Sequence, residues 1–368
     1  MDKRTVLFAL HELPGIGWQT ILKLIDGFDD LSGLPLQSVD RLSRLDIPAK
    51  KAEQLLTALQ GSFVSDRFLA YEARGIHVVT WYDEAYPVWL RHTSQPPWVL
   101  YASGDLSLLR RVSVAVVGTR TPTAYGKRVA HELSRDLADA GVTVVSGLAR
   151  GIDSEAHRGA LQSAGGGSTI GVLGCALDTV YPPENRELYA RIGKAGLLLS
   201  EFPLGTPVHP GLFPLRNRII AGLTRGTLVV EAAERSGSLI TSDLALGESR
   251  DVFAIPGPIT SPKSAGTHKL LKEGAKTVTC AEDILEEYDM WLKPPSAQRQ
   301  MNAQPRSAPV KLSPEEADLL SRISWEPASV DKLFELSGFA FGQMHAVLLS
   351  LLMKKQIQQL PGSTYVRI

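Results

Sequence analysis

Glycine, hydroxyl-bearing and arginine residues recur directly after apolar, β-branched stretches in the middle of the sequence. Glycine lets backbone N–H groups approach a ligand closely, helix N-termini favour anions, and arginine binds phosphate oxygens through two hydrogen bonds. This combination predicts a phosphate-binding pocket. The residues concerned are Gly118, Thr119, Arg120, Ser146, Gly147, Arg150, Ser236, Gly237 and Ser238.

A second basic group stands at the start of a predicted helix, in the segment 213–218. Arg216, Asn217 and Arg218 are expected to line the same pocket, although such a trio also occurs where arginines only cap a helix and form ion pairs. Phe213 is the candidate for stacking on a nucleic-acid base, and its alternative is a core position before Pro214. Each residue alone is a weak signal, so the prediction depends on their convergence on one rim.

Parallel strands alternating with helices would bring these residues together. Apolar runs at 112–117, 142–145, 170–173, 197–199, 227–230 and 252–255 predict the strands. Helical periodicity at 123–140, 154–164, 184–195, 238–247 and 267–274 predicts the helices between them. The alternation is typical of an α/β fold, here an extended Rossmann-like, doubly wound and mostly parallel sheet. Ligands of such sheets bind outside the carboxyl ends of the strands, which is where the glycines and arginines stand.

Smaller units are expected on either side of this core, which is assigned to residues 66–290. Residues 1–65 predict an N-terminal helical domain of the helix-hairpin-helix or SAM-like type, because Leu13, Pro14, Gly15, Ile16 and Gly17 separate two short helical patterns. The glycines of such a hairpin allow contact with a DNA phosphate. A tight turn without any ligand is an equally good interpretation, since one hairpin is a weak signal.

The C-terminal part divides into a Pro- and Gln-rich flexible linker at 291–311 and a winged-helix domain at 312–368. Three helices and a β-hairpin make up the predicted winged helix. Its candidate recognition helix ends in Lys354 and Lys355, where the positive charges complement the helix dipole. Because this domain has a slight excess of acidic residues, a protein-contact or regulatory role is favoured over tight duplex binding.

Several motifs of catalysis are absent from the sequence. No GxGxxG follows the first core strand, no GxxxxGK[ST] occurs, and no HExxH or dense His, Cys and Asp cluster indicates a metal. Asp153 is expected to cap the helix that begins near Ser154 rather than to act as a catalytic carboxylate. Since no nucleophile, base and orienting group can be named together, we expect neither an enzyme nor a cofactor.

Composition limits the remaining function classes. The chain has 368 residues, with 39 Lys and Arg against 39 Asp and Glu, and none of the segments 1–60, 61–290 and 312–368 is basic overall. Phosphate binding must therefore come from a local cluster and backbone N–H groups. No apolar run approaches the roughly 18 residues of a membrane span. Two cysteines cannot form a disulfide framework, so a cytoplasmic location is expected.

The motifs occur together, in order, in a known family. Gly118-Thr119-Arg120, the segment 146–153, the segment 213–223 and Ser236-Gly237-Ser238 resemble the DprA/Smf proteins, as do the segment 252–257 and Gly274-Ala275. The likeness is strong over residues 75–285 and looser at both ends. It implies a Rossmann-like core that binds single-stranded DNA in natural transformation.

The resemblance also implies roles for particular residues. The phosphate-binding arginine of the family falls on Arg120, and its neighbours fall on Gly118, Thr119, Ser146 and Gly147. Many members carry a lysine directly after a Tyr-Pro pair, but here Tyr181-Pro182 is followed by Pro183, and Arg186 is the candidate replacement.

The function expected from the resemblance is that of a non-catalytic mediator. Such a protein binds single-stranded DNA, protects incoming strands, helps load the recombinase RecA, and forms a homodimer. Two alternatives stay open. One is an enzyme similar to nucleotide phosphoribohydrolases, for which Gly165, Gly166 and Gly167 are only a fragment of the required loop. The other is an adaptor that acts mainly through protein contacts of the winged helix and dimer surface.

Overall fold

The computed structural model describes residues 1–164, 169–288, 292, 312–323, 328–354, 356–360 and 364–367. The chain divides into two compact units, Met1–Leu292 and Lys293–Ile368, which are treated separately below. The predicted linker 291–311, apart from Leu292, lies outside the described residues, as do the glycines at 165–167 and Lys355.

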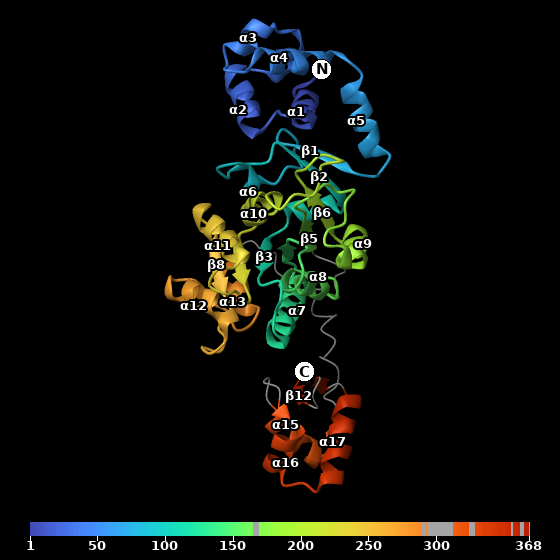
Figure 1. Cartoon of the computed structure of the whole chain (residues 1–368), viewed down its shortest axis with the longest axis vertical. Helices are drawn as coiled ribbons and strands as arrows, with labels where there is room; N and C mark the ends of the chain where they lie inside the picture. The colour runs from blue at the N-terminus through green and yellow to red at the C-terminus, as the bar shows by residue number, and fades with distance from the viewer. Residues whose placement is uncertain are drawn as a thin grey trace. The chain divides into compact units, whose positions relative to one another are not determined.

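A nine-stranded sheet forms the centre of the first unit (Figure 1). Its strand order is β1-β2-β6-β5-β4-β3-β7-β8-β9. All neighbours from β6 to β9 are parallel, whereas β1 and β2 are antiparallel additions at one edge. The predicted, mostly parallel α/β sheet is thus confirmed. The strands are β1 (His77–Thr80), β2 (Val99–Gly104), β3 (Ser113–Val117), β4 (Thr143–Ser146), β5 (Thr169–Val172), β6 (Leu197–Ser200), β7 (Gly226–Val229), β8 (Asp251–Ala254) and β9 (Lys276–Thr277).

Helices cover both faces of this sheet because its apolar side chains alternate between them. Val114 and Val116 of β3 pack in one cluster with α7 (Ala124–Asp139), α8 (Ile152–Ala160) and α13 (Glu282–Leu285). Ala115 and Val117 pack in the opposite cluster with α10 (Leu212–Leu223), α11 (Gly237–Gly247) and α12 (Ala265–Lys272). The result is a three-layer, doubly wound arrangement with β3 near its middle.

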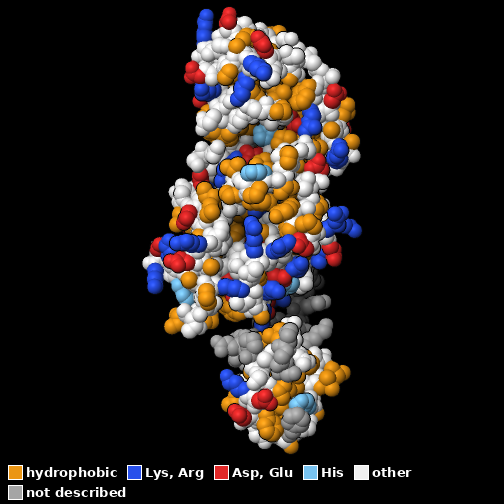
Figure 2. Space-filling view, viewed as in Figure 1, with side chains coloured by type: hydrophobic (Ala, Val, Ile, Leu, Met, Phe, Trp, Pro, Cys, Tyr) orange, Lys and Arg blue, Asp and Glu red, His pale blue; other side chains and the backbone are white. Residues whose placement is uncertain are grey.

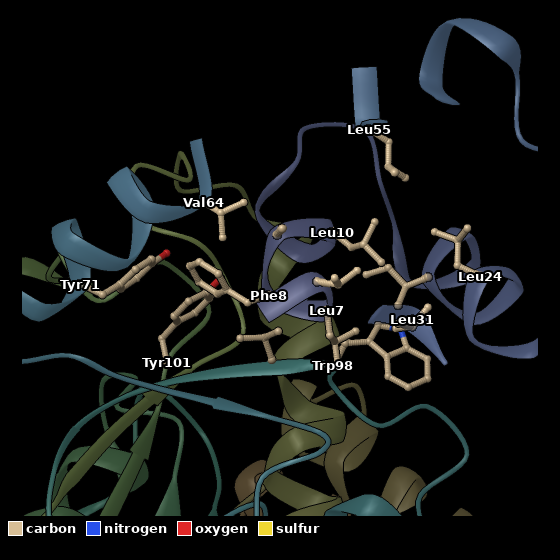
Figure 3. Packing of buried hydrophobic residues seen from close by; sticks show 14 of the residues in the cluster. Leu7, Phe8, Leu10, Leu24, Leu31, Leu55, Val64, Tyr71, Trp98 and Tyr101 are labelled. Atoms are coloured by element: carbon tan, nitrogen blue, oxygen red, sulfur yellow. The ribbon is translucent and has the colours of Figure 1, made fainter. Parts of the chain in front are cut away.

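The N-terminal helices pack on the β1–β2 edge of the sheet (Figure 1). They are α1 (Lys3–Glu12), α2 (Trp18–Gly27), α3 (Val39–Ser43), α4 (Ala49–Gln60) and α5 (Phe63–Glu72). The predicted turn between the first two is confirmed, and Gly15 adopts φ 80° there, a conformation that favours glycine. One hydrophobic cluster joins these helices to Trp98 and Tyr101 of the core (Figure 3). Residues 1–292 are therefore one compact unit, and the assignment of residues 1–65 as a domain of their own stays a prediction.

A buried carboxylate anchors this junction. Glu12 at the end of α1 accepts hydrogen bonds from the hydroxyls of Tyr71, at 2.6 Å, and Tyr101. The guanidinium of Arg67 forms an ion pair with the same carboxylate at 2.5 Å. The tyrosine rings stack with centroids 4.7 Å apart, so polar and apolar contacts hold α1 and α5 on β2 together.

Shorter elements complete the first unit. They are α6 (Val88–Arg91), α9 (Arg186–Ala195), and the 3₁₀ helices η1 (Leu31–Leu36), η2 (Leu106–Arg110), η3 (Pro183–Asn185), η4 (Pro262–Ser264) and η5 (Glu286–Tyr288). In Figure 1, α9 lies on one side of the sheet's middle, and α11, α12 and α13 lie on the other.

The second unit is a winged helix, as predicted. It contains α15 (Pro314–Arg322), α16 (Val330–Ser337) and α17 (Phe341–Met353), with a sheet of β10 (Ala328–Ser329), β12 (Thr364–Arg367) and β11 (Ile357–Leu360) in that order. Lys354, at the end of the candidate recognition helix, forms an ion pair with Glu316 at 2.6 Å. One of the two predicted cations is thus committed to its own domain.

Within the described residues, no single helix has the length and apolar character needed to cross a bilayer. One sharply bent pair, Val330–Ser337 with Gly342–Met353, meets the length and composition criteria only when its two helices are taken together.

Candidate nucleic-acid interface

A pocket of about 560 Å³ opens at the carboxyl ends of β3, β4 and β7. The chain proceeds from β3 to β4 in one direction and later crosses to β7 on the other side of β3, so the pocket lies at the topological switch point of the sheet. Most of the predicted residues meet there. The lining includes Gly118, Thr119, Arg120, Asp153, Tyr181, Phe213, Arg216, Asn217, Arg235, Ser236, Gly237, Ser238 and Thr241.

Arg216 of α10 is a buried cation of the pocket. Its side chain donates hydrogen bonds to the carbonyl oxygens of Gly147, at 2.6 Å, and Val172, and its Nε donates to the Asn217 amide oxygen at 3.2 Å. Burial lowers the pKa of Arg216 to about 10, although Asp153 opposes this shift, so the guanidinium remains charged at neutral pH. The carboxyl ends of β4 and β5 thus hold the positive charge of Arg216 at the base of the pocket.

Asp153 shapes the loop after β4 instead of capping a helix. The helix α8 begins at Ile152 with Gly151 as its N-cap, so the predicted cap at Asp153 is wrong. The carboxylate accepts hydrogen bonds from the backbone N–H groups of Gly147, at 3.2 Å, and Ala149, at 3.4 Å. Burial raises the pKa of Asp153, while Arg216 and these N–H groups act against the shift. The Asp153 side chain therefore orients the loop that contains Gly147, whose carbonyl oxygen accepts a hydrogen bond from Arg216.

Two exposed arginines stand above this buried charge. Arg120 follows β3, and Arg235 directly precedes the N-cap of α11. Within the part of the chain that the structure describes, neither guanidinium has a hydrogen bond or ion pair. Gly118 keeps the Arg120 loop close to the sheet, since a Cβ there would lie 2.7 Å from Ile152 and 2.9 Å from the Glu231 carbonyl oxygen. The two arginines are thus available to an anion at the rim.

An aromatic pair and a helix terminus complete the lining. The ring centroids of Tyr181 and Phe213 lie 5.2 Å apart. Gly174 leaves room for Phe213, because a Cβ at position 174 would lie 2.5 Å from the Phe213 ring. At the start of α11, the Ser236 hydroxyl accepts a hydrogen bond from the N–H of Ser238 at 3.4 Å. A Cβ added at Gly237 would meet nothing within 4 Å, so the backbone is open to a ligand there.

Some predicted residues occupy other positions. Gly147 and Arg150 line a small adjoining cavity, where Arg150 forms an ion pair with Glu184. The hydroxyl of Ser146 is buried and donates to the Val116 carbonyl oxygen at 2.7 Å. Ser146 lines neither the pocket nor the adjoining cavity, and the same holds for Arg186 and Arg218.

Arg218 and Arg186 stand away from the pocket lining. Arg218 is two residues after Arg216 on the same helix, which turns it to another face, and it pairs with Glu201. Arg186 begins α9 and is exposed, so its predicted replacement of the family lysine stays a prediction.

The predicted site residues do not include several lining residues, among them Arg235, Tyr181 and Thr241. Arg235 is adjacent to the predicted Ser236, so its position offered a signal. The sequence singles out Tyr181 only as part of the Tyr-Pro pair. Among the described residues, no group of three or more His, Cys, Asp and Glu side chains is placed to hold a metal ion.

Comparison with known proteins places the chain among DNA-processing proteins. Residues 77–289 match the family described as DNA recombination-mediator protein A, and residues 303–363 match the DprA winged helix domain. Protein Smf of Escherichia coli strain K12 is 40% identical over 341 residues, which cover 92% of this chain and 86% of that protein. DNA processing protein DprA of Bacillus subtilis strain 168 is 44% identical over 219 residues, which cover 59% of this chain and 73% of that protein.

Solved structures agree with this assignment. DNA processing protein A from Streptococcus pneumoniae superposes with a TM-score of 0.68 at 35% identity, covering 78% of this chain and 99% of that one. DNA processing protein A from Helicobacter pylori, in a structure described as showing its single-stranded DNA binding mode, gives a TM-score of 0.54 at 31% identity and covers 59% and 97%. The matched family region and these relatives show that the chain belongs to the DprA/Smf family of DNA-processing, recombination-mediator proteins.

Proposed function

We propose that this chain binds single-stranded DNA in the pocket at the β3–β7 switch point. The observation that carries the proposal is the grouping of three arginines: Arg216 is buried with its charge retained, while Arg120 and Arg235 are exposed and free of ion pairs among the described residues. Arginine binds phosphate oxygens in a bidentate manner. The single-stranded DNA binding mode described for the Helicobacter pylori relative supports the same ligand.

The geometry gives each group a separate role in the proposed complex. Arg120 holds a backbone phosphate, and Arg216 adds a fixed charge below it. The open backbone at Gly237 and the Ser236 and Ser238 hydroxyls give access to a second phosphate at the start of α11. Tyr181 and Phe213 offer aromatic surface for one base, and such stacking is tolerant of sequence.

We further propose that the protein protects incoming strands and helps load RecA during transformation, acting as a homodimer. The match to the recombination-mediator family supports this role. We also propose a non-catalytic mechanism, in which Asp153, the acidic residue of the pocket lining, holds its own loop through the N–H groups of Gly147 and Ala149. Loading is tested by following RecA filament formation on strands precoated with a single-stranded DNA-binding protein.

Fluorescence anisotropy with a labelled oligothymidylate tests the binding site. Arg120→Ala is expected to weaken binding about tenfold and to lower the salt slope by about 0.7, the value for one released single-strand phosphate contact. Arg191→Ala is the matched control, since Arg191 is an exposed arginine on α9 outside the pocket. Equal affinity of Arg120→Ala and wild type would remove the site assignment, and release of free base from nucleoside monophosphates would instead indicate the phosphoribohydrolase alternative.

A further inference from the structure

The cations around the pocket differ in how far their charges are already neutralised. On the side of α9, Arg150 is paired with Glu184. On the side of α11 and α12, Arg235 has no acidic partner among the described residues, and neither has Lys263 in the loop between β8 and α12. The ammonium of Lys263 donates only to the backbone carbonyl oxygen of Thr121, which leaves its positive charge uncompensated. Two uncompensated positive charges, those of Arg235 and Lys263, therefore lie on the α11 and α12 side of the rim.

The loop 256–263 borders the pocket directly. The backbone N–H of Ala232 donates to the Lys263 carbonyl oxygen at 2.8 Å, and Ala232 is followed by the lining residue Ala233. Across the rim, Lys263 reaches Thr121, the residue after Arg120. These contacts place the Lys263 ammonium next to the Arg120 loop, outside the pocket itself.

Exposed apolar surface lies beyond the pocket, on this loop and on the start of α7 that contacts it. Tyr125, in the first turn of α7, is 37% exposed, and its hydroxyl donates to the Pro256 carbonyl oxygen at 3.2 Å. Ile259 in the loop is 91% exposed. Single-strand binding surfaces combine cations that contact the phosphate backbone with aromatic rings that stack on the bases. Lys and Arg side chains are also seen across the middle of the core unit in Figure 2.

We propose that a DNA strand held in the Arg120 pocket continues over a surface formed by Lys263, Tyr125 and Ile259. Here Lys263 binds the phosphate that follows the one on Arg120, and Tyr125 stacks on the adjacent base. Ile259 covers the edge of that base. This inference rests on the proposed function, and it gives the strand one exit route, along loop 256–263. The rival route runs over α9 past Arg186.

The test compares two labelled oligothymidylates, one of about three nucleotides that fills the pocket and one of about twenty. Their affinities for the full chain are measured at low salt and along a salt series. Lys263→Met is expected to weaken binding of the long strand about tenfold and to lower its salt slope by about 0.7, while leaving the short strand unchanged. Tyr125→Ala is expected to weaken only the long strand, about tenfold, without changing the salt slope.

Two conservative variants separate contact from positioning. Tyr125→Phe keeps the ring and removes the bond to Pro256, so it should bind the long strand like the wild type. Lys263→Arg should restore the salt slope. If Lys263→Met weakens short and long strands equally, Lys263 acts by holding the Arg120 loop and the route is refuted.

The remaining outcomes also decide the question. A long-strand loss in Arg186→Ala, with none in Lys263→Met, overturns the route in favour of α9. If neither variant changes binding while Arg120→Ala does, the route fails and the pocket assignment survives. If Arg120→Ala binds both strands like the wild type, the proposed function itself fails.

Discussion

Replacing Gly147 by alanine tests whether the buried Arg216 is essential to the pocket. An added Cβ would lie 2.5 Å from Nη2 and 2.6 Å from both Cζ and Nη1 of Arg216. Ordinary contacts between heavy atoms need about 3.5 Å, so the guanidinium must move by about 1 Å. It cannot do so and keep its hydrogen bonds to the carbonyl oxygens of Gly147 and Val172.

The magnitude follows from these two bonds. A hydrogen bond to a charged group contributes about 1.5–3 kcal/mol, so losing both costs about 3–6 kcal/mol before any compensation. Water entering from the pocket recovers part of this, and we expect the free energy of unfolding to fall by about 2–4 kcal/mol. Because the guanidinium leaves its place below the rim, affinity for single-stranded DNA should fall at least about tenfold.

Urea unfolding followed by tryptophan fluorescence measures the stability, and fluorescence anisotropy measures the affinity. Gly237→Ala is the matched control for stability, because its added Cβ meets no atom within 4 Å at the same pocket. It should change the free energy of unfolding by less than about 0.5 kcal/mol. A Gly147→Ala variant as stable as Gly237→Ala, with unchanged affinity, would refute the reasoning from Arg216.

Three further changes address the surroundings of the pocket and the junction with the N-terminal helices. Glu184→Gln releases Arg150 from its exposed ion pair, so single-strand affinity should rise several-fold at low salt with stability within about 0.5 kcal/mol of the wild type. Burial lowers the pKa of His157 to about 3. As the pH falls, the unfolded chain therefore binds a proton at this imidazole before the folded chain does. The free energy of unfolding should fall by up to about 1.4 kcal/mol per pH unit between about pH 6.5 and pH 3. His157→Gln should remove this component from pH-dependent urea titrations. Glu12→Leu leaves the hydroxyl of Tyr101 without its buried acceptor. The free energy of unfolding, measured by thermal unfolding, should fall by about 3–5 kcal/mol.

The sheet was predictable because its central strands are nearly continuous apolar runs. The stretch 112–117 became β3 and the stretch 142–145 became β4, each within one residue at either end. Both faces of these strands are covered by helices, so most positions are apolar, and the polar exceptions Ser113, Thr143 and Ser146 are buried near the strand ends. Pairing of β1 and β2 with the same sheet was not predictable, since short alternating strands carry no signal for their partner.

Site residues were predictable where backbone geometry requires a particular residue type. They were less predictable where a partner far away in the sequence determines the position of the side chain. Gly118 and Gly237 follow from the need for an open strand end and an open helix start. The pairing of Arg218 with Glu201 depends on a contact between α10 and the end of β6, which spacing alone does not show. Helical periodicity did offer one usable signal: Arg216 and Arg218, two residues apart, cannot face the same ligand from one helix.

Charge balance explains how a chain with no net charge can bind a polyanion. Arg216 is buried at the carboxyl ends of the strands, and the arginines around it fall into two groups: Arg150 and Arg218 are neutralised by carboxylates, whereas Arg120 and Arg235 are not paired within the described residues. Only the second group attracts phosphates at a distance, and each exposed charge is screened within about 8 Å at physiological salt. Affinity must therefore depend on the placement of a few charges at one strand end. A surface substitution that adds a carboxylate beside Arg235 should consequently weaken binding more than the same substitution elsewhere on the protein.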